Sequence, residues 1–365
     1  MRLTVLMSFS GAGGVERMVM NLVREFARTG IQVDLLVLRA QGPHLQNIPD
    51  NVNLIKLKNT HTLPSVPELA RYLKKERPQY MLVAKDRAGR AALLARKFAG
   101  TDTKIVIRLG TNLSTALEKK SALSRWFRTA PMKAFYASVD KVVAVSEGVR
   151  QDTLGLTELA PECVTVIRNP VITPEMDKAI AEKAEHPWFN DTAITLIMGL
   201  GRLSQQKDFA TLIHAFALVR KVRPCRLIIL GEGGKREELE TLIDELNLSD
   251  AVSMPGFQSN PYAWLKHASV FVLSSLWEGS PNVLTEALAI GIPSVATLCP
   301  SGPDEVLQDG KYGELVPMQD SQAMSQAILK TLDSPLPAET IKLAVEEYRV
   351  DISAKKYLAL FKGED

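Results

Sequence analysis

Two glutamates eight positions apart carry the chemistry in this chain that best suits sugar binding. They bracket residues 278–286, which lie between an apolar run at 270–273 and a helix predicted to end near Ile290. Glu278 is expected in the turn before the helix, where backbone N–H groups and the positive helix N-terminus attract anions, and Glu286 is expected on the helix. A carboxylate accepts hydrogen bonds from sugar hydroxyls, whereas backbone amides bind phosphate. The turn therefore suits both halves of a nucleotide-sugar.

A second set of candidate residues lies in the loop at 199–209, which follows an apolar run at 195–198. Arg202 and Lys207 could neutralise a diphosphate there without a metal ion, because both side chains are cationic hydrogen-bond donors. The alternative is a pair of solvated surface cations. The chain has no Asp-x-Asp pair that could hold a metal ion, and this favours the ligand-binding interpretation.

Glycine-rich loops follow several of the predicted strands. Gly13 and Gly14 open a helix after the first strand, and Gly231, Gly256 and Phe257 follow strands of the second half. Because glycine lets a ligand approach the backbone closely, the first loop suits a ligand loop and the later ones could wall a base pocket. An ordinary tight turn is the alternative for each.

Positive charge is concentrated in the first half of the chain. Residues 1–185 carry 28 Lys and Arg against 18 Asp and Glu, a net charge of +10, whereas the remainder carries 16 against 23, a net charge of −7. The segment 124–136 mixes Arg and Lys with Trp, Phe and Tyr, which suits a helix lying on an anionic bilayer surface. The alternative is an ordinary helix with a solvated face. An anionic membrane surface is the expected partner of this half, and nucleic acid is not.

The composition is that of an ordinary globular protein. Its 365 residues are 46% hydrophobic, enough for two cores. Cys163, Cys225 and Cys299 are scattered and no histidines are paired at ligand spacing, so neither a disulfide framework nor a metal or other cofactor is expected. The chain shows no signal-peptide pattern and no run of about 18 apolar residues. These features predict a cytoplasmic protein, with contact to the inner face of the cytoplasmic membrane as an open alternative.

Short apolar runs alternate with helical patterns in both halves, which predicts parallel sheets covered by helices on both faces. The expected domains are residues 1–170 and 193–345, joined by a polar linker at 171–192, and residues 346–365 are expected to form a helix that packs back on the first domain. Each domain is predicted to be α/β, doubly wound and Rossmann-like, and the two are expected to face each other across a cleft. Strands are predicted at 3–7, 33–38, 80–84, 104–107, 141–145, 164–167, 195–198, 226–230, 270–273, 293–296 and 314–316.

Together these motifs resemble the retaining glycosyltransferases of family 4, which have the GT-B fold. The resemblance is carried by Arg202 with Lys207, by the E-x7-E element from Glu278 to Glu286, and by the Gly13-Gly14 pair, and it spans nearly the whole chain. It implies that Glu278 contacts hydroxyls of the transferred sugar, that Arg202 and Lys207 bind the diphosphate, and that Glu286 contacts the ribose. Transfer would be retaining and independent of a metal ion.

The resemblance also extends to the surroundings of these groups. Many family members carry a His on an N-domain loop where this chain has residues 108–112, so Arg108 and Asn112 are expected on the acceptor side. The amides at the start of the second-half helix would add to the diphosphate clamp, and the first glycine pair would approach it from the other domain. The expected donor-binding set is therefore Gly13, Gly14, Gly231, Gly256, Phe257, Asn282, Val283, Leu284 and Glu286.

Two stretches, 280–284 and 300–307, look most like the bacterial branch of this family that builds lipopolysaccharide and other surface glycans. This implies transfer of a hexose or N-acetylhexosamine from a UDP-sugar to a lipid-linked or lipopolysaccharide-type saccharide. One alternative is a non-hydrolysing nucleotide-sugar epimerase, which would need acid and base groups in the cleft that the sequence does not reveal. The other is a catalytically silent nucleotide-sugar-binding protein, against which the complete set of site residues argues.

Overall fold

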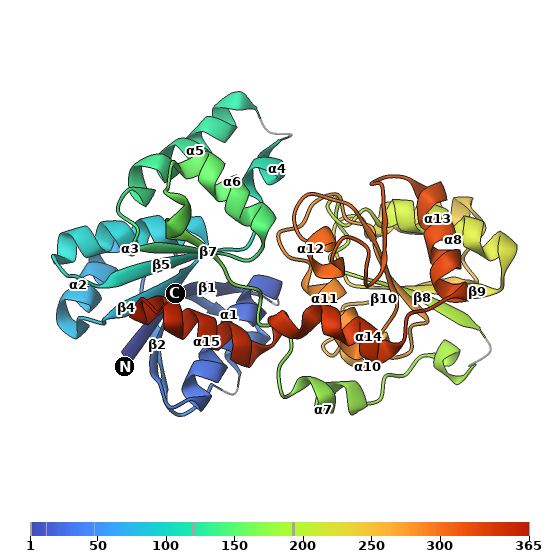
Figure 1. The fold of residues 1–365 in the computed structure, drawn as a ribbon, viewed down its shortest axis with the longest axis horizontal. Helices are drawn as coiled ribbons and strands as arrows, with labels where there is room; N and C mark the ends of the chain where they lie inside the picture. The colour runs from blue at the N-terminus through green and yellow to red at the C-terminus, as the bar shows by residue number, and fades with distance from the viewer. Residues whose placement is uncertain (1, 12, 47, 119–120, 192–193, 365) are drawn as a thin grey trace. The chain divides into compact units, whose positions relative to one another are not determined.

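The computed structural model describes residues 2–11, 13–46, 48–118, 121–191 and 194–364, and the chain divides into two units (Figure 1). The first unit comprises Met1–Val171 and Tyr348–Asp365, and the second comprises Ile172–Glu347. Most of the segment predicted as a linker belongs to the second unit. Helix α7 (Met176–Ala181) of this segment packs on α10 (Tyr262–Leu265) of the second unit, and Asn260 Nδ2 donates to the Ala179 carbonyl at 2.8 Å.

Seven parallel strands form one sheet in the described residues of the first unit, in the order β3-β2-β1-β4-β5-β6-β7. The order changes direction at β1, because β2 and β3 lie on one side of it and β4 to β7 on the other. This change defines a switch point between β1 and β4, where the loops after the two strands diverge to opposite faces of the sheet. The strands are β1 (Arg2–Ser10), β2 (Gln32–Gln41), β3 (Val52–Lys56), β4 (Tyr80–Ala84), β5 (Lys104–Leu109), β6 (Lys141–Ala144) and β7 (Val164–Val166).

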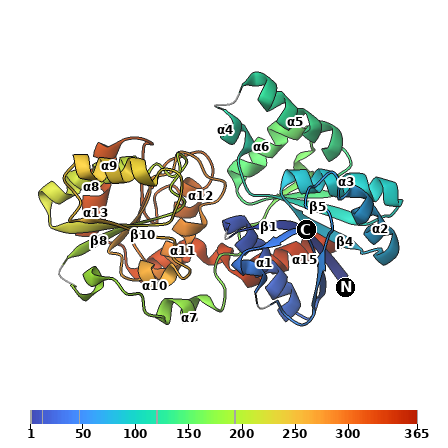
Figure 2. The same ribbon diagram turned by 180° about the vertical axis from the view of Figure 1, so that it is seen from behind.

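Alternate side chains of these strands enter two hydrophobic clusters, one on each face of the sheet. Val5 and Met7 pack with α1 (Gly14–Arg28) and α15 (Val350–Lys362), whereas Leu6 packs on the opposite face. The helices of that opposite face lie away from α1 and α15 in both ribbon views (Figures 1 and 2). They include α2 (Val66–Glu76), α3 (Asp86–Ala99), α5 (Ala122–Tyr136) and α6 (Glu147–Thr157). The remaining helices of the unit are short: α4 (Leu113–Leu117), η1 (Pro43–Leu45) and η2 (Pro161–Cys163).

Helix α15 is held to the first unit by aromatic side chains. The ring of Phe361 stacks on that of Tyr80 with centroids 5.3 Å apart, and Tyr357 meets Phe26 edge-on at 6.5 Å. Ser353 Oγ donates to the Arg168 carbonyl at 2.9 Å. The end of the chain is therefore part of the core of the first unit.

The second unit repeats the doubly wound plan. Among its described residues, six parallel strands are ordered β10-β9-β8-β11-β12-β13, with the switch point between β8 and β11. Helices α8, α9 and α13 enclose the apolar cluster on one face, and α11 packs on β11 and β12 and against α14. The elements are β8 (Thr195–Leu200), β9 (Cys225–Leu230), β10 (Val252–Gly256), β11 (Val270–Leu273), β12 (Ser294–Thr297), β13 (Glu314–Val316), α8 (Phe209–Val222), α9 (Arg236–Glu245), α11 (Asn282–Ile290), α12 (Pro303–Leu307), α13 (Ser321–Asp333), α14 (Ala338–Lys342), η3 (Pro187–Asn190) and η4 (Leu343–Tyr348).

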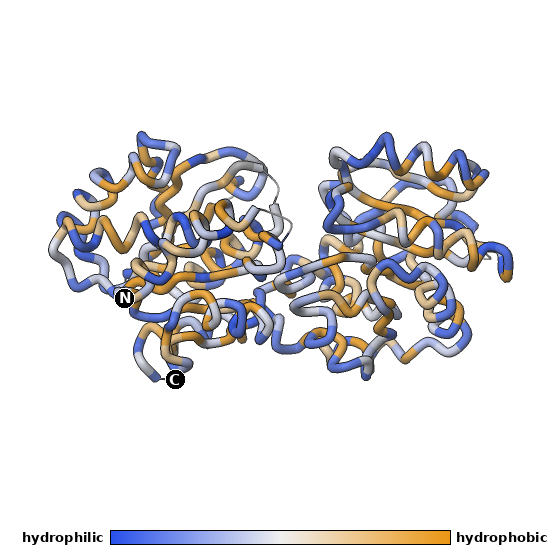
Figure 3. The backbone as a smooth tube through the Cα atoms, turned by 90° about the horizontal axis from the view of Figure 1, so that it is seen from above, coloured by the Kyte–Doolittle hydropathy of each residue, from blue (hydrophilic) through white to orange (hydrophobic). Residues whose placement is uncertain are grey.

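The prediction of two doubly wound α/β domains is confirmed. Both units have apolar segments running through their interiors, with hydrophilic residues interspersed on the outer helices (Figure 3). Strand β3 was not predicted from the sequence, and β10 was implied only by the expectation that Gly256 and Phe257 follow a strand; each lies at an edge of its sheet. Of the helices in the described ranges, none has the length and apolar character needed to cross a membrane.

Candidate functional site

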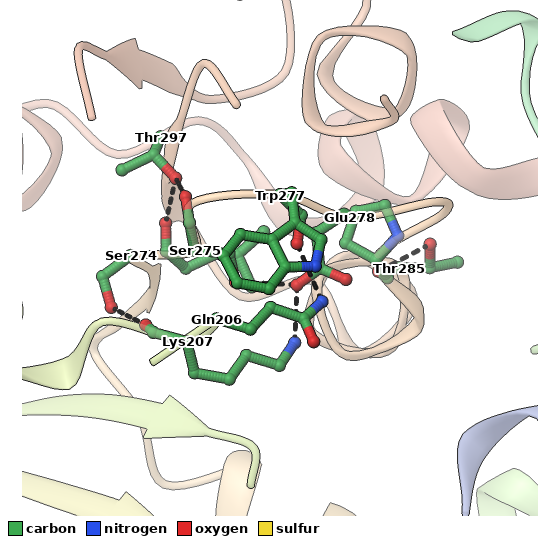
Figure 4. Close-up of polar contacts among 10 residues, drawn as sticks. Gln206, Lys207, Ser274, Ser275, Trp277, Glu278, Thr285 and Thr297 are labelled. Carbon is green, nitrogen blue, oxygen red and sulfur yellow. Dashed lines mark hydrogen bonds and ion pairs between the residues drawn. The ribbon is translucent and has the colours of Figure 1, made fainter. Parts of the chain in front are cut away.

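A buried ion pair joins the two loops at the switch point of the second unit. Lys207, in the loop after β8, places its Nζ 2.6 Å from Oε1 of Glu278, in the loop after β11, and the side chains are 15% and 9% exposed. The same carboxylate oxygen accepts a hydrogen bond from Ser275 Oγ at 2.7 Å. Figure 4 shows the lysine ammonium reaching this oxygen. A cation and a carboxylate that the sequence indicated separately are thus brought together at the carboxyl ends of two neighbouring strands.

Further hydrogen bonds fasten the same two loops along their backbones. The Leu276 amide donates to the Gln206 carbonyl at 2.8 Å, and Gln206 Nε2 donates to the Trp277 carbonyl at 2.8 Å (Figure 4). Ser274 Oγ donates to the Lys207 carbonyl at 2.7 Å. These contacts fix the backbone on both sides of the ion pair, so the pair is preorganised by its surroundings.

A third loop, between β12 and α12, contacts the turn that contains Glu278, here called the glutamate turn, from the other side. The Glu278 amide donates to the Pro300 carbonyl at 3.1 Å, and Thr297 Oγ1 donates to the Ser275 carbonyl at 2.5 Å. Gly302, with φ +112°, packs so closely on the turn that a Cβ there would lie 2.6 Å from Pro281 Cδ. Three strand-end loops therefore form one hydrogen-bonded and packed assembly.

The start of α11 follows the glutamate turn directly. Asn282 and Val283 are the first two residues of the helix, and no side chain caps its N-terminus. The Leu284 amide donates to the Pro281 carbonyl at 3.0 Å, so this predicted phosphate contact is already used within the turn. The remaining amides of the first turn suit an anion, because the helix dipole adds to their partial charge.

Glu286, the second predicted carboxylate, lies inside the second unit. It is fully buried, and the Tyr262 hydroxyl donates to its Oε1 at 3.5 Å. The structure thus separates the two glutamates by environment, because Glu278 forms the ion pair of the turn while Glu286 packs against α10. The predicted contact of Glu286 with a ribose stays a prediction.

The other predicted residues of the second unit follow the carboxyl ends of neighbouring strands. Gly231 adopts φ +139°, and a Cβ there would lie 1.9 Å from the Gly201 carbonyl oxygen, so only glycine fits. The Gly231 amide donates to the Gly256 carbonyl at 3.0 Å, and Phe257 beyond it is 59% exposed. Arg202 is exposed in the loop after β8. All lie on the strand-end edge that carries the ion pair, as parallel pairing requires.

Arg108, expected on the acceptor side, is buried inside the first unit. It is 1% exposed, and its Nη2 donates to Asn169 Oδ1. It also hydrogen-bonds to Tyr357 of α15, burial lowers the pKa of Arg108, and burial raises the pKa of Tyr357 to about 12. Its guanidinium therefore ties β5 to the C-terminal helix inside the first unit, and this placement does not support the prediction that it contacts an acceptor.

Gly13, Gly14 and Asn112 lie at helix starts of the first unit. Gly13 precedes α1 and Gly14 is its first residue, while Asn112 caps α4 by accepting from the Thr115 amide at 3.1 Å. Both positions follow strands and are therefore on the strand-end edge of the first sheet. Their contacts with donor and acceptor stay predictions.

Sequence reasoning did not find the groups that hold the ion pair in place. Gln206 and Thr297 make their contacts across loops that are far apart in the sequence, whereas Ser275 contacts Glu278 within one loop. One available signal was the pair of hydroxyl residues at 274–275, placed directly between an apolar strand and Glu278. Such residues at a strand end favour hydrogen bonds to neighbouring loops.

Cys299 packs near the ion pair but its thiol is protonated. Burial raises the pKa of Cys299 to about 12, and the negative charge of Glu278 adds to this rise. A neutral thiol is a poor nucleophile and a poor metal ligand. Over the described ranges, no three side chains among His, Cys, Asp and Glu gather in a way that could hold a metal ion.

Comparisons with known proteins agree with this geometry. Residues 12–174 match the family model described as Glycosyltransferase Family 4, and residues 180–347 match the model described as Glycosyl transferases group 1. The chain is 31% identical over 276 residues, 73% of its length and 72% of the relative, to the N-acetylgalactosamine-N,N'-diacetylbacillosaminyl-diphospho-undecaprenol 4-alpha-N-acetylgalactosaminyltransferase of Campylobacter jejuni. It is 26% identical, over 88% of its length and 86% of the relative, to the lipopolysaccharide core biosynthesis glycosyltransferase LpsE of Rhizobium meliloti.

Among solved structures, the chain is similar to that of HepE from Anabaena in complex with UDP and glucose. The TM-score is 0.78 at 18% identity, with each chain covered completely (100%). At this identity the likeness concerns the fold, and it supports the GT-B architecture expected from the sequence.

We predict that Gly302→Ala disturbs the glutamate turn and weakens binding of UDP, the nucleotide expected from the sequence, by at least about tenfold, which corresponds to about 1.4 kcal/mol. The added Cβ meets Pro281 Cδ at 2.6 Å and Ser280 Cα at 3.2 Å, so the turn must move. Calorimetric titration with UDP measures the effect.

Gly310→Ala is the matched control for this variant. Gly310 also has a positive φ of +90°, but the atom nearest to its added Cβ is the Gly313 oxygen at 3.7 Å. Both variants should lower the unfolding midpoint, since both place alanine at positive φ. Equal affinities of the two variants for UDP would show that the turn does not depend on this contact.

Proposed function

The chain belongs to glycosyltransferase family 4, and from that premise we propose how it acts. It transfers a hexose or N-acetylhexosamine from a UDP-sugar to a lipid-linked or lipopolysaccharide-type saccharide. Anomeric configuration is retained and no metal ion takes part. The observation that carries the proposal is the Lys207–Glu278 pair at the switch point of the second sheet, because a carboxylate can accept from sugar hydroxyls and the ammonium beside it can bind phosphate.

The Lys207 ammonium has the hydrogen-bonding capacity to serve two partners. It carries three N–H donors, and its contact with Glu278 Oε1 uses one of them. A donor diphosphate takes another, while sugar hydroxyls donate to the Glu278 carboxylate. The pair that orders the loops before binding therefore becomes the bridge between the leaving group and the transferred sugar.

Departure of the nucleotide leaves negative charge on the diphosphate, and this charge needs stabilisation in the transition state. Lys207, Arg202 and the first amides of α11 supply cations and N–H dipoles at one strand-end edge. Groups held in place before the reaction stabilise developing charge without reorganising, which is an effective form of catalysis. The leaving phosphate then assists attack of the acceptor hydroxyl on the same face, and this gives retention.

The names of relatives support the acceptor class. The Campylobacter jejuni relative is named for a diphospho-undecaprenol acceptor, and the Rhizobium meliloti relative for lipopolysaccharide core biosynthesis. The UDP in the Anabaena structure supports a UDP-linked donor. The net charge of +10 in residues 1–185 fits an acceptor that carries anionic groups.

We predict that Glu278→Gln lowers the rate of sugar transfer by at least about 100-fold, the scale seen when one preorganised transition-state contact is removed. The amide keeps the shape of the side chain but loses the charge that pairs with Lys207. Transfer from a panel of UDP-sugars to a lipid-linked oligosaccharide, followed by chromatography, gives the rates. The anomeric proton coupling in the product reports retention or inversion.

Glu237→Gln is the control, because Glu237 is an exposed carboxylate on α9 of the same unit. This control should transfer sugar at the rate of the unaltered protein. Full activity of Glu278→Gln, with its fold verified by circular dichroism, would refute the assigned role, and an inverted product would refute retention.

We predict that an excess of EDTA leaves the initial transfer rate unchanged. The physical reason is that Lys207 and Arg202 replace a divalent cation at the diphosphate. The assay is run beside a metal-dependent glycosyltransferase, which EDTA must inactivate under the same conditions. Loss of activity that added Mn²⁺ restores would contradict the metal-free part of the proposal.

The membrane contact predicted for residues 124–136 is also part of the proposal. Leu123, Trp126 and Phe127 on α5 are 65%, 60% and 64% exposed, which suits insertion into a bilayer interface. We predict that the double variant Trp126→Ser, Phe127→Ser sediments several-fold less with phosphatidylglycerol vesicles than the unaltered protein does. Phe98→Ser, which removes a 69% exposed ring from α3, is the control, and an equal loss in both would contradict a specific role for α5.

A further inference from the structure

The switch point of the first sheet also carries a lysine and a glutamate, but the two residue types are exchanged between the strands compared with the pair of the second sheet. Glu16 lies in the first turn of α1 after β1, and Lys85 directly follows β4, the strand that pairs with β1. Lys85 Nζ lies 4.0 Å from Glu16 Oε1. Ligands of open α/β sheets bind outside the carboxyl ends of strands at such a point. The first sheet therefore has a second position, so far without a role, where a charged pair meets a binding edge.

The two pairs differ in how tightly they are made. Lys207 contacts Glu278 at 2.6 Å with both side chains largely buried, whereas the Lys85 side chain is 50% exposed and stands at the longer distance. Within the described ranges of the chain, Lys85 makes no other ion pair. Glu16 is 5% exposed and also accepts from the Gly11 amide at 3.3 Å. The lysine is thus the exposed member of the pair, and the glutamate beside it is buried.

Lys85 also holds a backbone conformation that a lysine adopts only under constraint. Its φ of 77° and ψ of 141° lie where glycine is favoured. The Lys85 amide donates to the Arg108 carbonyl at 3.1 Å, so its position is fixed to the end of β5. Strained residues of this kind persist where a side chain is needed in a particular place. Glycine would fit the backbone better, yet it would remove the cation.

The residues around Lys85 leave its charge available. The Asp86 carboxylate is engaged by Arg90 at 2.7 Å, and Arg87 adds an exposed cation. The β5 end to which Lys85 is hydrogen-bonded continues into the loop that contains Asn112, for which acceptor contact was predicted. An ammonium group is a point charge that suits phosphate oxygens.

We propose that Lys85 is an acceptor-binding residue whose ammonium group binds a phosphate group of the acceptor. The inference rests on the proposed transferase function, since it gives the first unit the acceptor. It adds a residue and a ligand chemistry to that function, namely recognition of a phosphorylated saccharide or lipid diphosphate by a cation at the first switch point.

The test uses the full chain saturated with UDP, so that the cations of the second unit are occupied, and inorganic pyrophosphate as the probe. Binding is measured by calorimetry. Lys85→Gln should bind pyrophosphate at least about tenfold more weakly than the unaltered protein, and Lys85→Arg should stay close to it. Lys97→Gln is the matched control, because Lys97 is an exposed cation in the last turn of the same helix, α3.

A second comparison separates binding from folding. Lys85→Gly and Arg77→Gly each replace a residue of positive φ, 77° and 43°, at the two ends of the segment that contains β4. Both should raise the unfolding midpoint by removing backbone strain, and only Lys85→Gly should lose pyrophosphate affinity. That result would show that the strained lysine is kept for its charge.

The outcomes distinguish this inference from the function on which it rests. Pyrophosphate affinity of Lys85→Gln equal to that of Lys97→Gln, or no pyrophosphate binding by the UDP-saturated protein, overturns the role of Lys85. Failure of the unaltered protein to bind UDP overturns the proposed donor instead. UDP affinity should be the same in all four Lys85 and Lys97 variants.

Discussion

The Lys207–Glu278 ion pair is the interaction on which the strand-end loops of the second unit depend. It joins the loops after β8 and β11, which are neighbours in the sheet although β9 and β10 come between them in the sequence. Both charges are largely removed from water, and a buried pair is stable only while both partners are present, because losing one leaves the other uncompensated. Under the proposed function, loop order and ligand binding use the same two groups, so a change in one changes the other.

The packing around this pair explains why certain positions require glycine. A Cβ at Gly231 would lie 1.9 Å from a neighbouring carbonyl oxygen. At Gly302 the loop after β12 packs directly against the glutamate turn. Both have positive φ, of 139° and 112°. Gly231 lets the loop after β9 approach the loop after β8, and Gly302 lets the loop after β12 approach the loop after β11. The two glycines thus determine how closely the loops pack, whether or not they contact a ligand themselves.

The sequence was informative where local chemistry decides structure, and uninformative where distant segments decide it. Central strands were predictable because both of their faces are buried, which makes them continuous apolar runs. Of the four edge strands, β7 and β13 were predicted, whereas β3 was missed and β10 had no predicted bounds. Both β3 and β10 are only partly buried and mixed in polarity, and β10 contains Pro255, so neither forms a continuous apolar run. Glu278 and Lys207 were chosen from residue type and setting, and the structure brings them together. The burial of Arg108 had no local signal, because its partner Tyr357 lies on a helix far along the chain.

The contrast between the two switch points bears on how one fold serves many glycan acceptors. In the second unit the pair is short, buried and braced by hydrogen bonds from three loops, so little reorganisation accompanies binding of a ligand. In the first unit the pair is longer and its lysine half-exposed, so the lysine is less constrained. A tight site suits a donor diphosphate, whose geometry is constant among nucleotide-sugars. A looser one suits acceptors, which differ among the relatives as their names record. The same topology can therefore keep its donor chemistry while the acceptor side changes.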